Sequence, residues 1–129
     1  MKIGILKCAI QEAEMSEHPL YQIGSVIFKG SRIFYSCNNS FRSSTITIKY
    51  KRFEHTLHAE QSALNGVNWE TLKGASILVI RYNTSGNMSL GYPCKYCIES
   101  IRHVRIKFLY YSTRKGEIKR EKLKYGKEN

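Results

Sequence analysis

The chain has 129 residues, of which 42% are hydrophobic and 24% are charged, and its formal net charge is +11. This length and composition predict one globular domain over residues 1–129. No stretch approaches the ~20 apolar residues with which a helix crosses a bilayer, so we expect no membrane-spanning helix. Nothing near Met1 has the pattern of a signal peptide. We therefore expect a cytoplasmic protein with no membrane partner, whose basic charge favours phosphorylated or polyanionic ligands.

The first third of the sequence predicts a helix followed by a hairpin. Apolar residues recur at helical spacing over residues 3–16, and the dipeptide His18-Pro19 ends this helix. Residues 21–28 and 32–37 are rich in β-branched and aromatic side chains and flank a turn at residues 29–31. This arrangement is typical of two paired strands.

Helices and strands alternate through the rest of the chain. The predicted elements are a long polar loop over 38–55, a helix over 57–67, a strand over 75–80, a glycine-bearing loop over 82–92, a helix over 94–104, and strands over 107–111 and 117–123. The alternation predicts an α/β fold in which helices cover both faces of a mixed five-stranded sheet, giving three αβα layers. Residues 113–116 leave no room for a helix before the last strand, so this strand should be antiparallel to its neighbour.

Two short motifs carry the chemistry of a zinc site. The first is His58-Ala59-Glu60, and the second is Pro93-Cys94-Lys95-Tyr96-Cys97. Zinc binds imidazole and thiolate ligands tetrahedrally, and a catalytic zinc keeps one position for water. His58, Cys94 and Cys97 supply three protein ligands and leave that one position, which predicts a catalytic metal centre.

Helix geometry sets conditions on both motifs. Pro93 suits the first position of a helix, which puts Cys94 and Cys97 on one face of the first turn, where the positive helix end favours thiolates. His58 and Glu60 would point about 200° apart in a regular helix. They share a site only if His58 lies in the irregular start of its helix, and Thr56 as the N-cap residue places that start correctly.

The assembled site predicts a hydrolytic reaction. A water molecule bound to zinc has a pKa lowered towards neutrality, which yields a hydroxide nucleophile. Glu60 would take the proton of this water and pass it to a ring nitrogen of the substrate, and then to the leaving ammonia.

His-x-Glu followed by Pro-Cys-x-x-Cys, with a predicted strand over 77–80 between them, resembles the signature of the cytidine deaminase superfamily. The resemblance covers residues 3–123 and implies zinc as the cofactor and conversion of a cytosine base to uracil with release of ammonia. It also implies a set of substrate contacts. These are the backbone N–H groups of Ala59 and Cys94 on the base or the attacking water, Asn38 on the sugar with Asn39 as the alternative, and His55 and Pro93 beside the substrate.

Two kinds of substrate stay open. The hairpin ending resembles the branch that acts on free nucleosides, so a free cytidine or deoxycytidine nucleoside or nucleotide is the first hypothesis. Superfamily members with this antiparallel ending also include polynucleotide editors and toxins. Single-stranded DNA or RNA is the second, because ten basic residues lie between 102 and 127 and aromatic residues are interleaved with basic ones there and in the loop over 41–53. A lysine-rich, solvent-exposed strand explains the C-terminal charges equally well without nucleic acid.

A third hypothesis is a zinc-stabilised binding protein without catalysis. A structural zinc site needs a fourth protein ligand, for which His55 and His103 are the candidates. Glu60 argues against this hypothesis, because a structural site has no use for a proton shuttle. Family members commonly assemble, so we also expect that a homo-oligomer can form.

Overall fold

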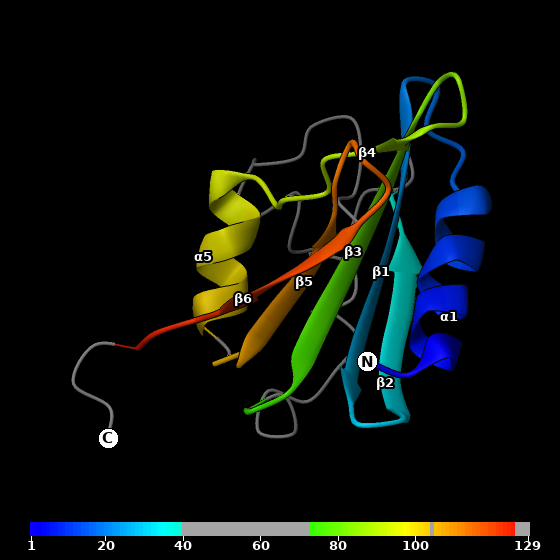
Figure 1. Cartoon of the computed structure of the whole chain (residues 1–129). Helices are drawn as coiled ribbons and strands as arrows, with labels where there is room; N and C mark the ends of the chain where they lie inside the picture. The colour runs from blue at the N-terminus through cyan, green and yellow to red at the C-terminus, as the bar shows by residue number, and fades with distance from the viewer. Residues whose placement is uncertain (40–72, 104, 126–129) are drawn as a thin grey trace.

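The computed structural model of the protein describes residues 1–39, 73–103 and 105–125 (Figure 1). Its helices and strands are, in chain order, α1 (Ile3–Glu14), β1 (Tyr21–Lys29), β2 (Arg32–Asn38), β3 (Ser76–Asn83), β4 (Met88–Ser89), α5 (Lys95–His103), β5 (Phe108–Ser112) and β6 (Ile118–Lys122). The predicted helix over 57–67 and most of the predicted loop over 38–55 lie outside the described residues. No helix within the described ranges is long and apolar enough to cross a membrane.

One mixed sheet joins the described strands in the order β2-β1-β3-β5-β6, with β4 paired to β3. β3 and β5 run parallel, and each of the other described pairs is antiparallel. The predicted mixed sheet and its antiparallel last strand are therefore confirmed. The turn into β6 is closed by hydrogen bonds from Gly116 N to Thr113 O (3.1 Å) and from Thr113 N to Glu117 O (2.9 Å). Gly116 has a φ of 80°, a conformation that glycine adopts without strain.

The segment over 82–92 contains strand structure, so its prediction as a loop is wrong in part. β3 continues to Asn83, and Met88–Ser89 pairs back onto it as β4, a sixth strand beside the predicted five. Asn83 closes the turn, because its Oδ1 accepts the N–H groups of Ser85 and Asn87, both at 3.0 Å. A returning strand of only two residues is too short to leave a periodic pattern in the sequence.

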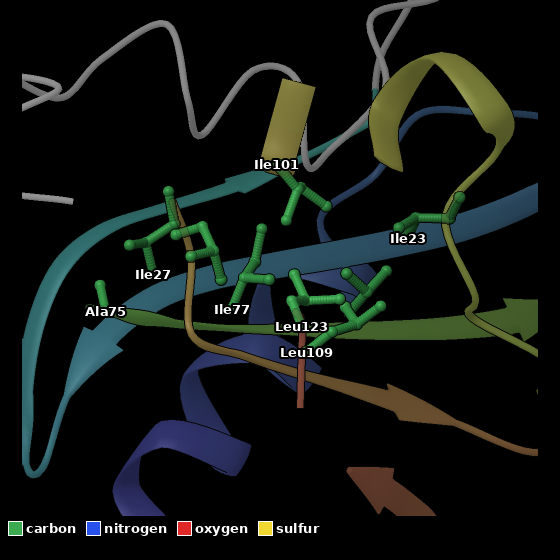
Figure 2. Packing of buried hydrophobic residues seen from close by; sticks show 9 residues of the cluster. Ile23, Ile27, Ala75, Ile77, Ile101, Leu109 and Leu123 are labelled. Atoms are coloured by element: carbon green, nitrogen blue, oxygen red, sulfur yellow. The ribbon is translucent and has the colours of Figure 1, made fainter. Parts of the chain in front are cut away.

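α1 and α5 cover opposite faces of the sheet, which confirms the three predicted layers (Figure 1). On one face, Ile5 and Ala9 of α1 pack with residues of β1 and β3. These strand residues are Val26, Phe28, Leu78 and Ile80. On the other face, Ile101 of α5 packs in a cluster with Ile23, Ile27, Ala75, Ile77, Val79, Ile106, Leu109 and Leu123 (Figure 2). β3 supplies alternate residues to both clusters, as its continuous apolar sequence predicts.

Candidate active site

The two cysteines of the second motif lie at the start of α5. Cys94 directly precedes the helix, and its carbonyl oxygen accepts a hydrogen bond from Ile98 N at 2.9 Å. Cys97 lies in the first turn and is fully buried, whereas Cys94 is exposed. Pro93 lies two residues before the first helical residue, so its predicted place at that first position is wrong. The reason is that Cys94, whose carbonyl begins the helical hydrogen bonding, takes the capping position.

The sulfur atoms of these cysteines fit a shared metal ion. Cys94 Sγ and Cys97 Sγ are 3.4 Å apart, whereas the two sulfurs of a disulfide are about 2.05 Å apart. Two sulfur ligands of one tetrahedral zinc, each at about 2.3 Å from the metal, lie about 3.8 Å from each other. The positive end of α5 stabilises the thiolate forms that bind zinc. These two side chains therefore suit two of the three predicted zinc ligands.

The cysteines lie at the end of the sheet where ligands of α/β proteins bind. α5 runs in the opposite direction to β3, so the start of α5 and the carboxyl ends of β3 and β5 lie at the same end of the molecule (Figure 1). Open α/β sheets bind their ligands outside the carboxyl ends of the strands. The predicted placement of the second motif, at a helix start near these ends, agrees with the observed arrangement.

A buried serine at the end of β5 holds the segment that leads to Cys94. Ser112 Oγ donates a hydrogen bond to Ser89 O at 2.7 Å and accepts one from Arg81 N at 3.0 Å. Ser112 O accepts a further bond from Gly91 N at 2.9 Å. A Cβ atom at position 91 would lie 2.7 Å from Ser112 Oγ, so this close approach requires glycine. The backbone is thus fixed three residues before Cys94.

The sequence alone does not predict the hydrogen bonds of Ser112. A single serine at the end of a strand has no distinctive signal, because its partners come from other strands. Gly91 carried a weak signal, since an isolated glycine close to a motif is typical of a backbone that packs tightly against its neighbours.

Tyr92, which immediately precedes Pro93, is held against β5 and β6. Its hydroxyl donates a hydrogen bond to Glu121 Oε2 at 3.0 Å, and its ring meets the ring of Tyr111 edge-on with centroids 5.0 Å apart. Partial burial first, and then the hydrogen bond to Glu121 and its negative charge, raise the pKa of Tyr92 above the usual value for tyrosine. The hydrogen bond and the ring contact hold Tyr92 at the surface next to the buried Pro93.

The two asparagines at the end of β2 have partners within the protein. Asn38 Nδ2 donates to Glu12 Oε1 of α1 at 3.2 Å, on the face opposite to α5. Asn39 is 2% exposed, and its Oδ1 accepts hydrogen bonds from Ile23 N and Ser16 Oγ, both at 2.7 Å. A sugar contact by Asn39 would have to replace these bonds. The sugar contact stays a prediction for both asparagines.

The first motif lies outside the described residues. His55, His58, Ala59 and Glu60 therefore stay predicted site residues, and so does the contribution of Pro93 to substrate binding. Within the described parts of the chain, no group of three or more His, Cys, Asp or Glu side chains is close enough to hold a metal ion. The third predicted zinc ligand, His58, lies outside these parts and stays a prediction.

Known proteins share a family model and a fold with this chain. The family model described as the cytidine and deoxycytidylate deaminase zinc-binding region matches residues 2–113. The structure is similar to the crystal structure of a cytidine deaminase from Burkholderia pseudomallei, with a TM-score of 0.66 and 14% sequence identity, over 95% of this chain and 92% of that chain. At this identity the similarity shows a shared fold. A comparison with curated proteins gave no match.

Proposed function

Because the chain belongs to the family of the cytidine and deoxycytidylate deaminase zinc-binding region, we propose that it hydrolyses the amino group at C4 of a cytosine base. One water is consumed, the C4–N bond breaks, and uracil and ammonia are formed. The observation that carries this proposal is the pair of sulfur atoms 3.4 Å apart at the start of α5, at the end of the sheet that binds ligands in α/β folds.

The proposed roles divide between metal binding and proton transfer. Cys94 and Cys97 would hold zinc together with His58, and the segment fixed by Ser112 would keep the two thiolates in place. Bound zinc supplies the Lewis acidity that makes water nucleophilic near neutral pH. Glu60 would transfer one proton of the attacking water to the ring nitrogen N3, which keeps it in uracil, and the second proton to the departing amine, which leaves as ammonia.

The first candidate substrate is a free cytidine or deoxycytidine nucleoside or nucleotide. The turn between β5 and β6 has no room for a helix, and β6 pairs antiparallel with β5. This ending resembles the branch of the superfamily that acts on free nucleosides, and that resemblance supports a small substrate.

The second candidate substrate is a single-stranded polynucleotide, which a surface on β5 and β6 favours. Phe108 pairs with Lys122 and Tyr110 pairs with Arg120 across the two strands, so these four side chains share one face of the sheet. Arg120 Cζ lies 4.8 Å from the ring centroid of Phe108. Aromatic rings beside cations suit stacked bases and phosphates. This face is the one that α1 covers, so a strand bound there would have to pass around the end of the sheet to reach the cysteines beside α5.

Replacing Glu60 tests the proposed chemistry directly. Glu60→Gln keeps the size of the side chain but removes the proton acceptor, so we expect turnover to fall by about 100-fold or more while zinc stays bound. Ammonia release measures turnover, and plasma mass spectrometry measures zinc. Glu54→Gln, in the neighbouring sequence, is the control and should keep its activity. If Glu60→Gln turns over like the unchanged protein, the proposed role of Glu60 is wrong.

A substrate panel separates the candidate functions. The unchanged protein, with zinc bound, is incubated with cytidine, deoxycytidine, CMP, dCMP and single-stranded oligonucleotides that contain cytosine. Deamination of the small molecules supports the first substrate class, and deamination of oligonucleotides alone supports the second. Zinc-bound protein that deaminates none of them would favour the non-catalytic binding protein.

A further inference from the structure

Arg81 is a half-buried cation on the same face of the sheet as α5. Alternate residues of a strand share a face, and Ile77 and Val79 of β3 both pack in the cluster that contains Ile101 of α5. Arg81 continues this row towards the carboxyl end of β3 and lies opposite Ile23 of β1, another member of the cluster. The row therefore brings a positive charge to the end of the sheet where α5 begins.

The rise per residue of α5 and of β3 places Arg81 and Cys94 at a similar height along the sheet. Ile101 and Ile77 pack in one cluster (Figure 2). From this cluster, Cys94 lies seven residues back along the helix, a rise of about 10 Å. Arg81 lies four residues forward along β3, a rise of about 13 Å. Since α5 and β3 run in opposite directions, both displacements lead to the same end of the molecule (Figure 1).

The guanidinium of Arg81 is held in place by stacking. Its Cζ lies 4.3 Å from the ring centroid of Tyr21, and that ring in turn stacks on His18 with centroids 4.2 Å apart. The backbone N–H of Arg81 is bound by Ser112 Oγ at 3.0 Å. Both the main chain and the side chain of Arg81 are thus positioned before any ligand binds.

Stacking leaves the hydrogen-bond donors of Arg81 available. A planar guanidinium that stacks on a ring keeps its N–H groups at its edge, where they match the oxygen atoms of a phosphate. Within the described parts of the chain, Arg81 Nε is buried and has no hydrogen-bond partner. Buried polar atoms are nearly always paired, so the unpaired Nε makes this guanidinium a candidate partner for an anion.

We propose that Arg81 binds the phosphate of a nucleoside monophosphate whose cytosine base lies at Cys94 and Cys97. This inference rests on the proposed function and narrows its substrate from nucleosides and nucleotides together to the nucleotide. Arg81 would act as a specificity-determining residue: it would strengthen binding of the phosphorylated substrate and leave binding of the base unchanged. A role in packing alone, through the contact with Tyr21, would affect both kinds of ligand equally.

The experiment compares a phosphorylated and an unphosphorylated ligand by isothermal titration calorimetry on the full chain. The two ligands are dUMP and deoxyuridine, which correspond to deaminated products and so bind without turnover. The variants are Arg81→Gln, which removes the charge, and Arg81→Lys, which keeps it but loses the planar fork. Arg32→Gln is the matched control, because Arg32 Cζ also lies over a ring, at 5.0 Å from the centroid of Phe34.

We expect dUMP to bind the unchanged protein about 10- to 150-fold more tightly than deoxyuridine, the range for a hydrogen bond to a charged group. Arg81→Gln should abolish this preference without weakening deoxyuridine binding, and Arg81→Lys should restore it only in part. Arg32→Gln should behave like the unchanged protein. No preference in the unchanged protein, or an equal loss for both ligands in Arg81→Gln, would overturn the inference.

A labelled single-stranded oligonucleotide distinguishes the source of the phosphate. If binding of the oligonucleotide depends on Arg81 while binding of dUMP does not, the phosphate belongs to a polynucleotide and the monophosphate assignment is wrong. Failure of the proposed function has a different signature. Protein that binds dUMP through Arg81 but deaminates nothing in the substrate panel rejects the proposed deaminase reaction, whereas active protein without phosphate preference rejects only the role of Arg81.

Discussion

Cys97 combines complete burial with the chemistry of a metal ligand. Its side chain is 0% exposed, and its sulfur lies 3.4 Å from that of Cys94. Cys97→Ser keeps the size of the side chain but replaces a soft thiolate, which zinc prefers, with a hydroxyl that stays protonated. We therefore expect purified Cys97→Ser to lose its zinc, as measured by plasma mass spectrometry. Cys8→Ser on α1 is the control and should keep zinc, and zinc retained in both variants would contradict the ligand assignment.

Ser112 is a second residue for which the structure predicts the effect of a substitution on stability. Ser112→Ala leaves the carbonyl of Ser89 and the N–H of Arg81 without their partner, and Ser112 itself is fully buried. Unsatisfied buried groups of this kind cost about 1–3 kcal/mol in the free energy of unfolding. Urea unfolding measures the loss. Ser31→Ala, in the exposed turn before β2, should change stability by less than about 0.5 kcal/mol. An equal loss in both variants would show that the hydrogen bonds of Ser112 do not stabilise the fold.

At the scale of elements, the packing of α1 on β1 depends on a glycine. A Cβ atom at Gly24 would lie 2.1 Å from Ala9 O and 2.5 Å from Ala13 N, both backbone atoms of α1. Because these are backbone atoms, no side-chain rotation relieves the clash, and α1 has to move away from the sheet. We expect Gly24→Ala to destabilise the protein by about 3 kcal/mol or more, at the upper end for overpacked sites. Thermal unfolding followed by circular dichroism measures this change.

Gly4→Ala is the matched control for this prediction. Gly4 lies in the first turn of α1, and a Cβ atom there would have nothing within 4 Å. Alanine has a higher helix propensity than glycine, so this variant should gain up to about 1 kcal/mol of stability. Replacing glycine by alanine should thus raise the free energy of unfolding at position 4 in the helix and lower it at position 24 in the strand. A loss of stability in both would show that the close contact at Gly24 does not decide the outcome.

At the scale of the whole molecule, a zinc ion held by Cys94, Cys97 and the predicted ligand His58 would link distant parts of the chain. A metal that binds only the folded state stabilises it by about 2.7 kcal/mol when its concentration is 100 times its Kd. Removing zinc with a chelator should therefore lower the melting temperature by about 10 °C, and added zinc should restore it. Scanning calorimetry measures this shift. The melting temperature of Cys97→Ser should not respond to the chelator, and an equal response in the variant would contradict a shared metal site.

Local sequence patterns determined much of this protein. The apolar spacing over residues 3–16 predicts a helix that the structure places at Ile3–Glu14, and the turn at 29–31 predicts the observed hairpin. The spacing of Cys94 and Cys97 predicts a shared position at a helix start. These features follow from the sequence because each depends on residues only a few positions apart, whose geometry the helix or the turn sets by itself.

Only the tertiary structure decided which distant residues meet. Ser112 holds the segment before Cys94, Gly24 lies against α1, and Arg81 stacks on Tyr21, which is 60 residues earlier in the chain. The two-residue strand β4 likewise exists only because β3 extends far enough to pair with it. Each of these contacts depends on strand order and register, which are set by packing of the whole sheet. The sequence alone therefore determined the cysteines of the proposed zinc site, and the tertiary structure decided which distant residue, Ser112, holds the segment that leads to them.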